Sequence, residues 1–110
     1  MESPTDASSC KIPGEDLSKD PERAGHLAEM LKALAHPLRL RIVAVLCRDR
    51  EHVSGLAQRL GVGQAVVSQQ LRILRMRGLV VREHSEGFAY YRLGEPRLQE
   101  LVRCMEGCSL

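Results

Sequence analysis

Two short amphipathic segments separated by a glycine-rich break most constrain what this chain can fold into. The segments span residues 54–60 and 64–76, and Gly61-Val62-Gly63 lies between them. Apolar residues recur at helical spacing in both segments, as Leu56 and Leu60 do in the first. Two helices joined by a tight turn that contains glycine are typical of a helix-turn-helix. Each predicted helix therefore has one face to bury and one face to expose.

The exposed face of the second segment carries hydrogen-bonding side chains. A helix that lies in the major groove of DNA contacts base edges and phosphates through such groups. The candidates on this face are Gln64, Ser68, Gln69, Arg72 and Arg75. Because Gln and Arg are also ordinary surface residues, a solvated helix face is the alternative interpretation of the same pattern.

A β-hairpin is predicted directly after this helix. Residues 79–84 and 88–93 are rich in β-branched and aromatic side chains, and a polar link with one glycine separates them. A hairpin that follows a recognition helix forms a wing. Its candidates for contact with the DNA backbone or minor groove are Arg82, His84 and Arg92.

Three further helices are predicted over residues 20–34, 37–46 and 96–107, and a proline lies in the first turn of each. The middle one is apolar nearly all round, so we expect it to be the central buried helix. The predicted fold is mainly α with a small β-hairpin. Its order is three helices, the recognition helix, two strands and a last helix, which is a winged helix-turn-helix.

Length and charge indicate one small basic domain. Residues 1–19 are rich in Ser, Pro and acidic side chains, so we expect a flexible tail ahead of a domain at 20–110. The first 20 residues hold five of the 14 acidic and two of the 16 basic side chains, which leaves a net charge of +5 in the remainder. An excess of arginine between residues 72 and 92 predicts attraction to phosphate.

The start of the chain shows no signal-peptide pattern, and no apolar run approaches the ~20 residues that span a bilayer. We therefore expect a cytoplasmic protein with no membrane partner.

Several runs of residues resemble one family. KALAHPLRLRI from Lys32, LAQRLGVGQAVVSQQLRILRMRGLV from Leu56 and EGFAYYRL from Glu86 are similar to the ArsR/SmtB family of winged-helix transcriptional repressors, over roughly residues 24–101. The resemblance implies a homodimer, formed through the first and last helices, that occupies a double-stranded DNA operator until an effector loosens it. The family commonly has His where this chain has Gln70, and a basic residue where it has Phe88. We include Gln70 among the predicted DNA contacts.

Four cysteines, at positions 10, 47, 104 and 108, are the candidates for sensing an effector. In the cytoplasm they are expected to be reduced thiols rather than structural disulfides. The arsenic and cadmium type of the family has a Cys-x-Cys where residues 53–56 of this chain carry no thiol. The zinc, cobalt and nickel type has Asp and His on the last helix, and here that helix has no His. The resemblance therefore gives neither metal site to this chain.

The placement of Cys47 with Cys104 or Cys108 resembles that in family members that sense sulfide, persulfide or oxidants. Those members have one cysteine on the second helix and one near the end of the last helix. Cys108 matches the C-terminal family position, whereas Cys47 lies about one turn beyond the usual second position, which Ala44 occupies. The pairing of Cys47 with Cys104 or with Cys108 stays open. Three thiolates could instead hold arsenite or another soft metal ion, with Cys10 in reserve. The third alternative is that the cysteines sense nothing.

Together these patterns predict a sequence-specific DNA-binding transcriptional regulator, a repressor that a cysteine-directed signal releases from its operator. The chain lacks a phosphate-binding glycine loop, a Gly-x-Ser-x-Gly run and a metalloprotease motif, so an enzyme is not predicted. No cofactor is required, apart from a soft metal ion or arsenite if one is the effector. A winged helix that binds protein is the alternative class, and its binding would respond little to salt.

Overall fold

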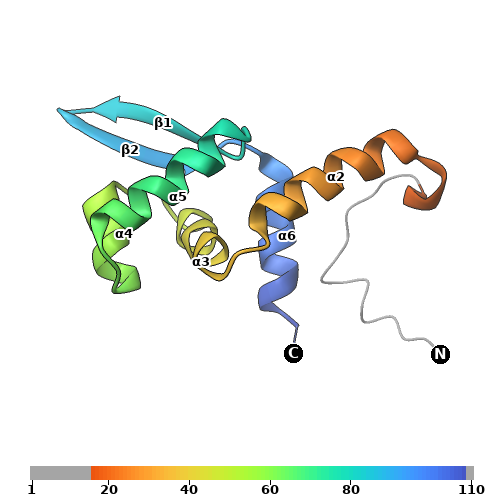
Figure 1. Cartoon of the computed structure of the whole chain (residues 1–110), viewed down its shortest axis with the longest axis horizontal. Coiled ribbons are helices and arrows are strands. Elements are labelled where there is room, and N and C mark those ends of the chain that lie inside the picture. The colour runs from red at the N-terminus through yellow and green to blue at the C-terminus, as the bar shows by residue number, and fades with distance from the viewer. Residues whose placement is uncertain (1–15, 109–110) are drawn as a thin grey trace.

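The computed structural model describes residues 16–108. Its elements are, in chain order, η1 (Leu17–Lys19), α2 (Pro21–Leu34), α3 (Pro37–Leu46), α4 (Val53–Leu60), α5 (Gln64–Met76), β1 (Val80–Ser85), β2 (Phe88–Leu93) and α6 (Pro96–Glu106). Figure 1 shows α3 in the middle of the molecule, with α4 and α5 on one side, α6 on the other, and α2 extending away. The predicted winged helix-turn-helix and the order of its elements are confirmed.

Side-chain caps determine where several helices begin. The carboxylate of Asp20 accepts a backbone N–H of the first turn of α2 at 3.0 Å, at the position where this helix was predicted to begin. In α3 and α4 a histidine has this role. His36 Nδ1 accepts from Leu38 N–H at 3.2 Å, and His52 Nδ1 accepts from Gly55 N–H at 2.9 Å. Each cap satisfies a backbone donor that has no partner inside its helix.

The stretch predicted as a tail contains one short element. Leu17–Lys19 form a 3-10 helix, and the carboxylate of Asp16 accepts the backbone N–H of Ser18 at 3.0 Å. An acid-rich composition indicates a tail because little can be buried, but it does not register such local Asp turns. Residues 1–15, which include Cys10, and residues 109–110 lie outside the described range.

One apolar core joins the helices. Its members with no exposed surface include Ile42 of α3, Leu56 of α4, Leu71 and Leu74 of α5, and Leu98 of α6. Within residues 16–108 no polar or charged residue is buried. The expectation that α3 is central is confirmed, because three of its side chains enter this core. Of the helices in the same range, none combines the length and hydropathy that a membrane span requires.

Residues with positive φ form the turn of the helix-turn-helix and the turn at the wing tip. Gly61 ends α4 with φ +70° and donates its N–H to Ala57 O, so the chain can enter α5 after two residues. At the tip of the wing Glu86 and Gly87 have φ of 53° and 83°. Positive φ at both central residues is what a type I′ two-residue hairpin turn requires. These turns fix the positions of α5 and of the wing.

The pairing of β1 with β2 decides which wing residues share a face. Arg82 lies opposite Tyr91, and His84 lies opposite Ala89. Side chains alternate across a strand, and directly paired residues point to the same side. Arg82, His84 and Tyr91 therefore share one face of the wing. Arg92 belongs to the other face.

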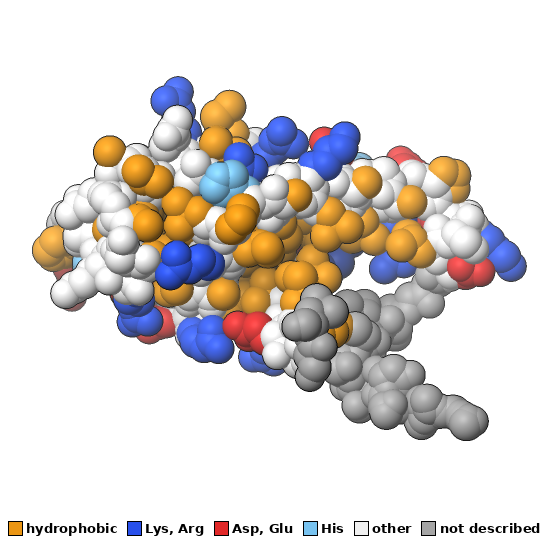
Figure 2. Space-filling view, turned by 60° about the horizontal axis from the view of Figure 1, so that its bottom comes forward, with side chains coloured by type: hydrophobic (Ala, Val, Ile, Leu, Met, Phe, Trp, Pro, Cys, Tyr) orange, Lys and Arg blue, Asp and Glu red, His pale blue; other side chains and the backbone are white. Residues whose placement is uncertain are grey.

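The helix α2 is only partly covered by the rest of its own chain. Ala33 and Leu34 at its end are buried, but Leu31 is 49% exposed, and Leu17 just before the helix is 43% exposed. Figure 2 shows apolar side chains extending from the body of the molecule along α2 on the face turned toward the viewer. Apolar side chains on this helix thus remain accessible in a single chain.

Candidate nucleic-acid interface

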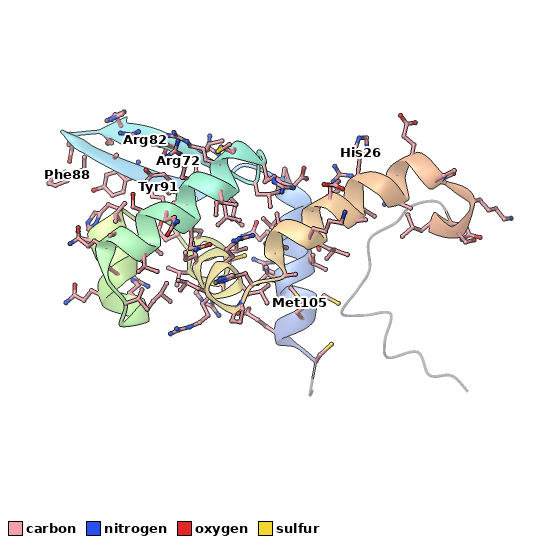
Figure 3. All side chains as sticks on the ribbon, viewed as in Figure 1. His26, Arg72, Arg82, Phe88, Tyr91 and Met105 are labelled. Carbon is pink, nitrogen blue, oxygen red and sulfur yellow. The ribbon has the colours of Figure 1, made fainter. Side chains whose placement is uncertain are left out.

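A groove of about 430 Å³ lies between α5 and the wing. We call it the α5–wing groove, and it is lined by Ala65, Ser68, Gln69, Arg72 and Arg75 of α5 and by Arg82 and Tyr91 of the wing. Figure 3 shows Arg72 on α5 near Arg82 and Tyr91. Polar and cationic side chains from two elements thus converge on one open surface.

The arginines of the α5–wing groove are not neutralised by the rest of the described chain. Within residues 16–108 no carboxylate lies within 4.0 Å of the charged nitrogens of Arg72, Arg75 or Arg82. Other arginines nearby are paired, since Arg77 lies 3.5 Å from Glu29 and Arg92 lies 3.0 Å from Glu83. Three uncompensated cations around one groove attract a polyanion.

Five of the predicted DNA contacts line this groove, namely Ser68, Gln69, Arg72, Arg75 and Arg82. Two more are exposed nearby. Gln64 is the first residue of α5, and His84 lies on the same face of β1 as Arg82, closer to the wing tip. The sequence pattern therefore placed most of its candidates on one continuous surface.

Gln70 and Arg92 point elsewhere. Gln70 Oε1 accepts a hydrogen bond from Arg39 Nε of α3 at 2.8 Å. Arg92 Nε donates to Glu83 Oε2 at 3.0 Å on the other face of the wing. This hydrogen bond is the main reason why the pKa of the Glu83 carboxyl is lowered from its usual value. Among the predicted wing residues, the positive charge that faces the groove comes from Arg82.

Sequence reasoning missed Tyr91, which lines the α5–wing groove. The signal was present, because a two-residue turn at Glu86-Gly87 places Tyr91 opposite Arg82. Counting the register back from the turn would have added its ring to the site.

The other face of the wing packs against the start of α4. The ring of His52 lies 6.0 Å from that of Phe88 and 5.7 Å from that of Tyr90, and the guanidinium of Arg50 lies 4.3 Å from the centre of the Tyr90 ring. Phe88, where the family pattern has a basic residue, thus contributes to this contact, although it is 58% exposed. The cluster holds the tip end of the wing against the start of α4.

The described cysteines do not converge on one site. Cys104 is disulfide-bonded, whereas Cys47 and Cys108 carry free thiols, so Cys47 is bonded to neither of the two partners considered for it. Cys10 lies outside the described range. In residues 16–108 no group of three or more His, Cys, Asp or Glu side chains is arranged to hold a metal ion.

Cys47 lies at the end of α3, in a cavity of about 390 Å³ that Arg48, Gln99, Arg103 and Glu106 also line. Gln99 Nε2 donates to the backbone oxygen of Cys47 at 2.8 Å. Burial raises the pKa of the Cys47 thiol, and Glu106 raises it further, against the opposing effect of Arg48 and Arg103. Since the thiolate is the reactive form, Cys47 is placed in an environment that slows thiol chemistry.

Known proteins share this architecture. Residues 36–81 match the family described as bacterial regulatory protein, arsR family. The biofilm growth-associated repressor of Xylella fastidiosa (strain Temecula1) is 38% identical over 91 residues, which cover 83% of this chain and 77% of that protein.

Solved structures agree with the fold. The transcriptional repressor BigR from Xylella fastidiosa has a TM-score of 0.77 and 34% identity, and the match covers 87% of this chain and all of that one (100%). The homodimeric winged helix-turn-helix domain of Mb0332 from Mycobacterium bovis has a TM-score of 0.69 and 25% identity, with 86% and 87% of the two chains covered. This chain belongs to the arsR family of bacterial regulatory proteins, and it is a DNA-binding transcriptional regulator with a winged helix-turn-helix.

Proposed function

We propose that this regulator is a repressor that occupies a double-stranded DNA operator as a homodimer, with α5 in the major groove and the wing against the backbone. The charge of the α5–wing groove is the main support, because Arg72, Arg75 and Arg82 face solvent there without acidic partners in the described residues. Ser68 and Gln69 lie beside them and can hydrogen-bond base edges. The role is binding rather than catalysis, and it needs no cofactor because all these groups belong to the chain.

A second copy of the chain is the partner that the uncovered apolar surfaces favour. Leu31 of α2 is 49% exposed and Met105 of α6 is 38% exposed, and burying such side chains is favourable by about 25 cal/mol per Å². The Mb0332 domain is described as homodimeric. Two recognition helices about 34 Å apart enter successive major grooves, and a symmetric pair supplies two. Such a dimer acts where bacterial DNA lies, in the cytoplasm.

Binding to DNA is tested by its salt dependence. A duplex enriched from a random library with the wild-type protein serves as the probe in a fluorescence anisotropy titration. We expect the logarithm of the binding constant to fall linearly with the logarithm of the salt concentration. The slope should be about −0.9 for each phosphate that the protein neutralises. A winged helix that binds protein through an apolar surface would show little response. Failure to enrich any duplex would contradict the proposal.

We further propose that oxidation of Cys104 is the signal that releases the operator. Cys104 lies on α6, one residue before the exposed Met105, so a bond to its sulfur acts beside the proposed dimer surface. Cys104 is disulfide-bonded, whereas Cys47 and Cys108 carry free thiols. Peroxide converts two thiols into one disulfide and is itself reduced to two molecules of water. Arsenite binding by Cys47, Cys104 and Cys108 has less support, because a sulfur in a disulfide cannot ligate as a thiolate.

Peroxide treatment should weaken operator binding about 5–150-fold, the usual range for coupling between two sites. The Cys104→Ser variant should bind equally well before and after treatment. Cys108→Ser is the matched control on the same helix terminus and should respond like the wild type. Anisotropy reports the affinity, and intact mass under non-reducing conditions reports the loss of about 2 Da per disulfide. A Cys104→Ser protein that still responds would exclude this signal.

A further inference from the structure

Arg39 of α3 lies where three helices meet. Its Nε donates to Gln70 Oε1 on α5 at 2.8 Å, and its Nη1 donates to the backbone oxygen of Ala33 on α2 at 2.9 Å. Both hydrogen bonds are partly buried. One guanidinium therefore connects the last turn of α2 with the middle of the recognition helix.

The two acceptors suit an arginine. Ala33 belongs to the last turn of α2, where carbonyl oxygens have no partner within the helix and carry partial negative charge. Hydrogen bonds from a charged donor are about twice as strong as neutral ones. A planar guanidinium can serve both acceptors at a fixed angle, and a lysine ammonium cannot reproduce that geometry. The connection is thus directional as well as strong.

Gln70 stands between the two sides of α5. Its neighbour Gln69 lines the α5–wing groove, and its other neighbour Leu71 has no exposed surface. The apolar side chains of α5 hold the helix against the core and determine which face points outward, and the bond from Arg39 to Gln70 restrains rotation of the helix about its axis. That rotation decides whether Gln69 and Arg72 face the groove.

We infer that Arg39 and Gln70 are positioning residues for operator binding. They transmit the placement of α2 to the recognition helix, and Gln70 does not itself touch DNA. The inference rests on the proposed function, since α2 carries the exposed Leu31 that a second copy of the chain would cover. A shift of α2 in the dimer would move Ala33 O, then Arg39, and then α5.

Two variants of Gln70 test this inference, with the enriched duplex described above as the probe. Gln70→Ala removes the acceptor and should lower affinity about tenfold, the equivalent of about 1.4 kcal/mol. Gln70→Glu keeps an acceptor oxygen and adds a charge that pairs with Arg39, so it should bind more tightly than Gln70→Ala. If Gln70 touched bases or phosphates, the order would be reversed, because a carboxylate is repelled by DNA. A reversed order would overturn the inference.

The partner residue gives an independent readout. Arg39→Met should lose affinity by a similar factor, and the double variant Arg39→Met with Gln70→Ala should bind no more weakly than either single variant. The slope of affinity against salt should not change in Arg39→Met, because no phosphate contact is lost. Additive losses or a flatter slope would count against the positioning role. If the wild type enriches no duplex, that result contradicts the proposed function rather than this inference. If Arg39→Met does not fold, the comparison of Gln70→Glu with Gln70→Ala still tests the inference.

Discussion

Replacing Arg72 with alanine should weaken binding to the enriched duplex about 5–150-fold, the equivalent of about 1–3 kcal/mol. The guanidinium lines the α5–wing groove and has no acidic partner in the described chain, so its full charge is available to DNA. Anisotropy titrations at several salt concentrations measure the effect. A lost phosphate contact would lower the salt slope by about one, whereas a lost base contact would relax preference at one position of the duplex.

Arg92→Ala is the matched control for this prediction. It removes the same charge from the same unit, but Arg92 lies on the other face of the wing and pairs with Glu83 at 3.0 Å. Arg50 also lies 3.3 Å from Glu83, so the carboxylate keeps one partner in the variant. We expect Arg92→Ala to bind nearly as well as the wild type. Equal losses in the two variants would show that overall charge, rather than the groove, determines affinity.

Replacing Leu71 with alanine should lower the free energy of unfolding by about 2–5 kcal/mol. Leu71 has no exposed surface and anchors the recognition helix in the core. The smaller side chain leaves a cavity that rigid neighbouring helices fill only in part. Urea unfolding followed by circular dichroism measures the change at fixed protein concentration. Met76→Ala, at the end of the same helix and 76% exposed, should change stability by less than about 0.5 kcal/mol.

A loss below about 1 kcal/mol in Leu71→Ala would contradict the placement of α5 on the core. Because α5 carries the groove residues on the opposite side, such a result would also remove the structural basis for Arg72. The two large effects are therefore linked through one helix.

Elements whose signals are local could be predicted from the sequence. The bounds of α5 at Gln64 and Met76 were predicted. The signals are the helical spacing of its apolar residues, the glycine turn before it and the hairpin after it, and each of these is read from a few neighbouring residues. The start of α2 and the two strands were predicted for the same reason. Most groove residues followed, since a buried stripe on a helix determines which side chains face outward.

Partnerships between distant residues could not be predicted. Arg39 lies 31 positions from Gln70, and nothing in either neighbourhood indicates that the two side chains meet. Arg92 was counted as free charge, although Glu83 across the hairpin neutralises it. The sequence likewise left the pairing of Cys47 open, and the free thiols of Cys47 and Cys108 follow from three-dimensional placement. A count of basic residues along the chain therefore overestimates the positive charge that is available to a nucleic acid.

Because one side of α2 is uncovered, the stability of the folded protein should depend on its concentration. If pairing buries Leu31 and its neighbours, association stabilises the folded form by mass action, and dilution removes that gain. A cell that makes few copies would hold them mostly as single chains with a loosely supported α2. A modest rise in synthesis would then increase both resistance to proteolysis and occupancy of the operator. Occupancy of the operator would therefore rise more steeply than the rate of synthesis.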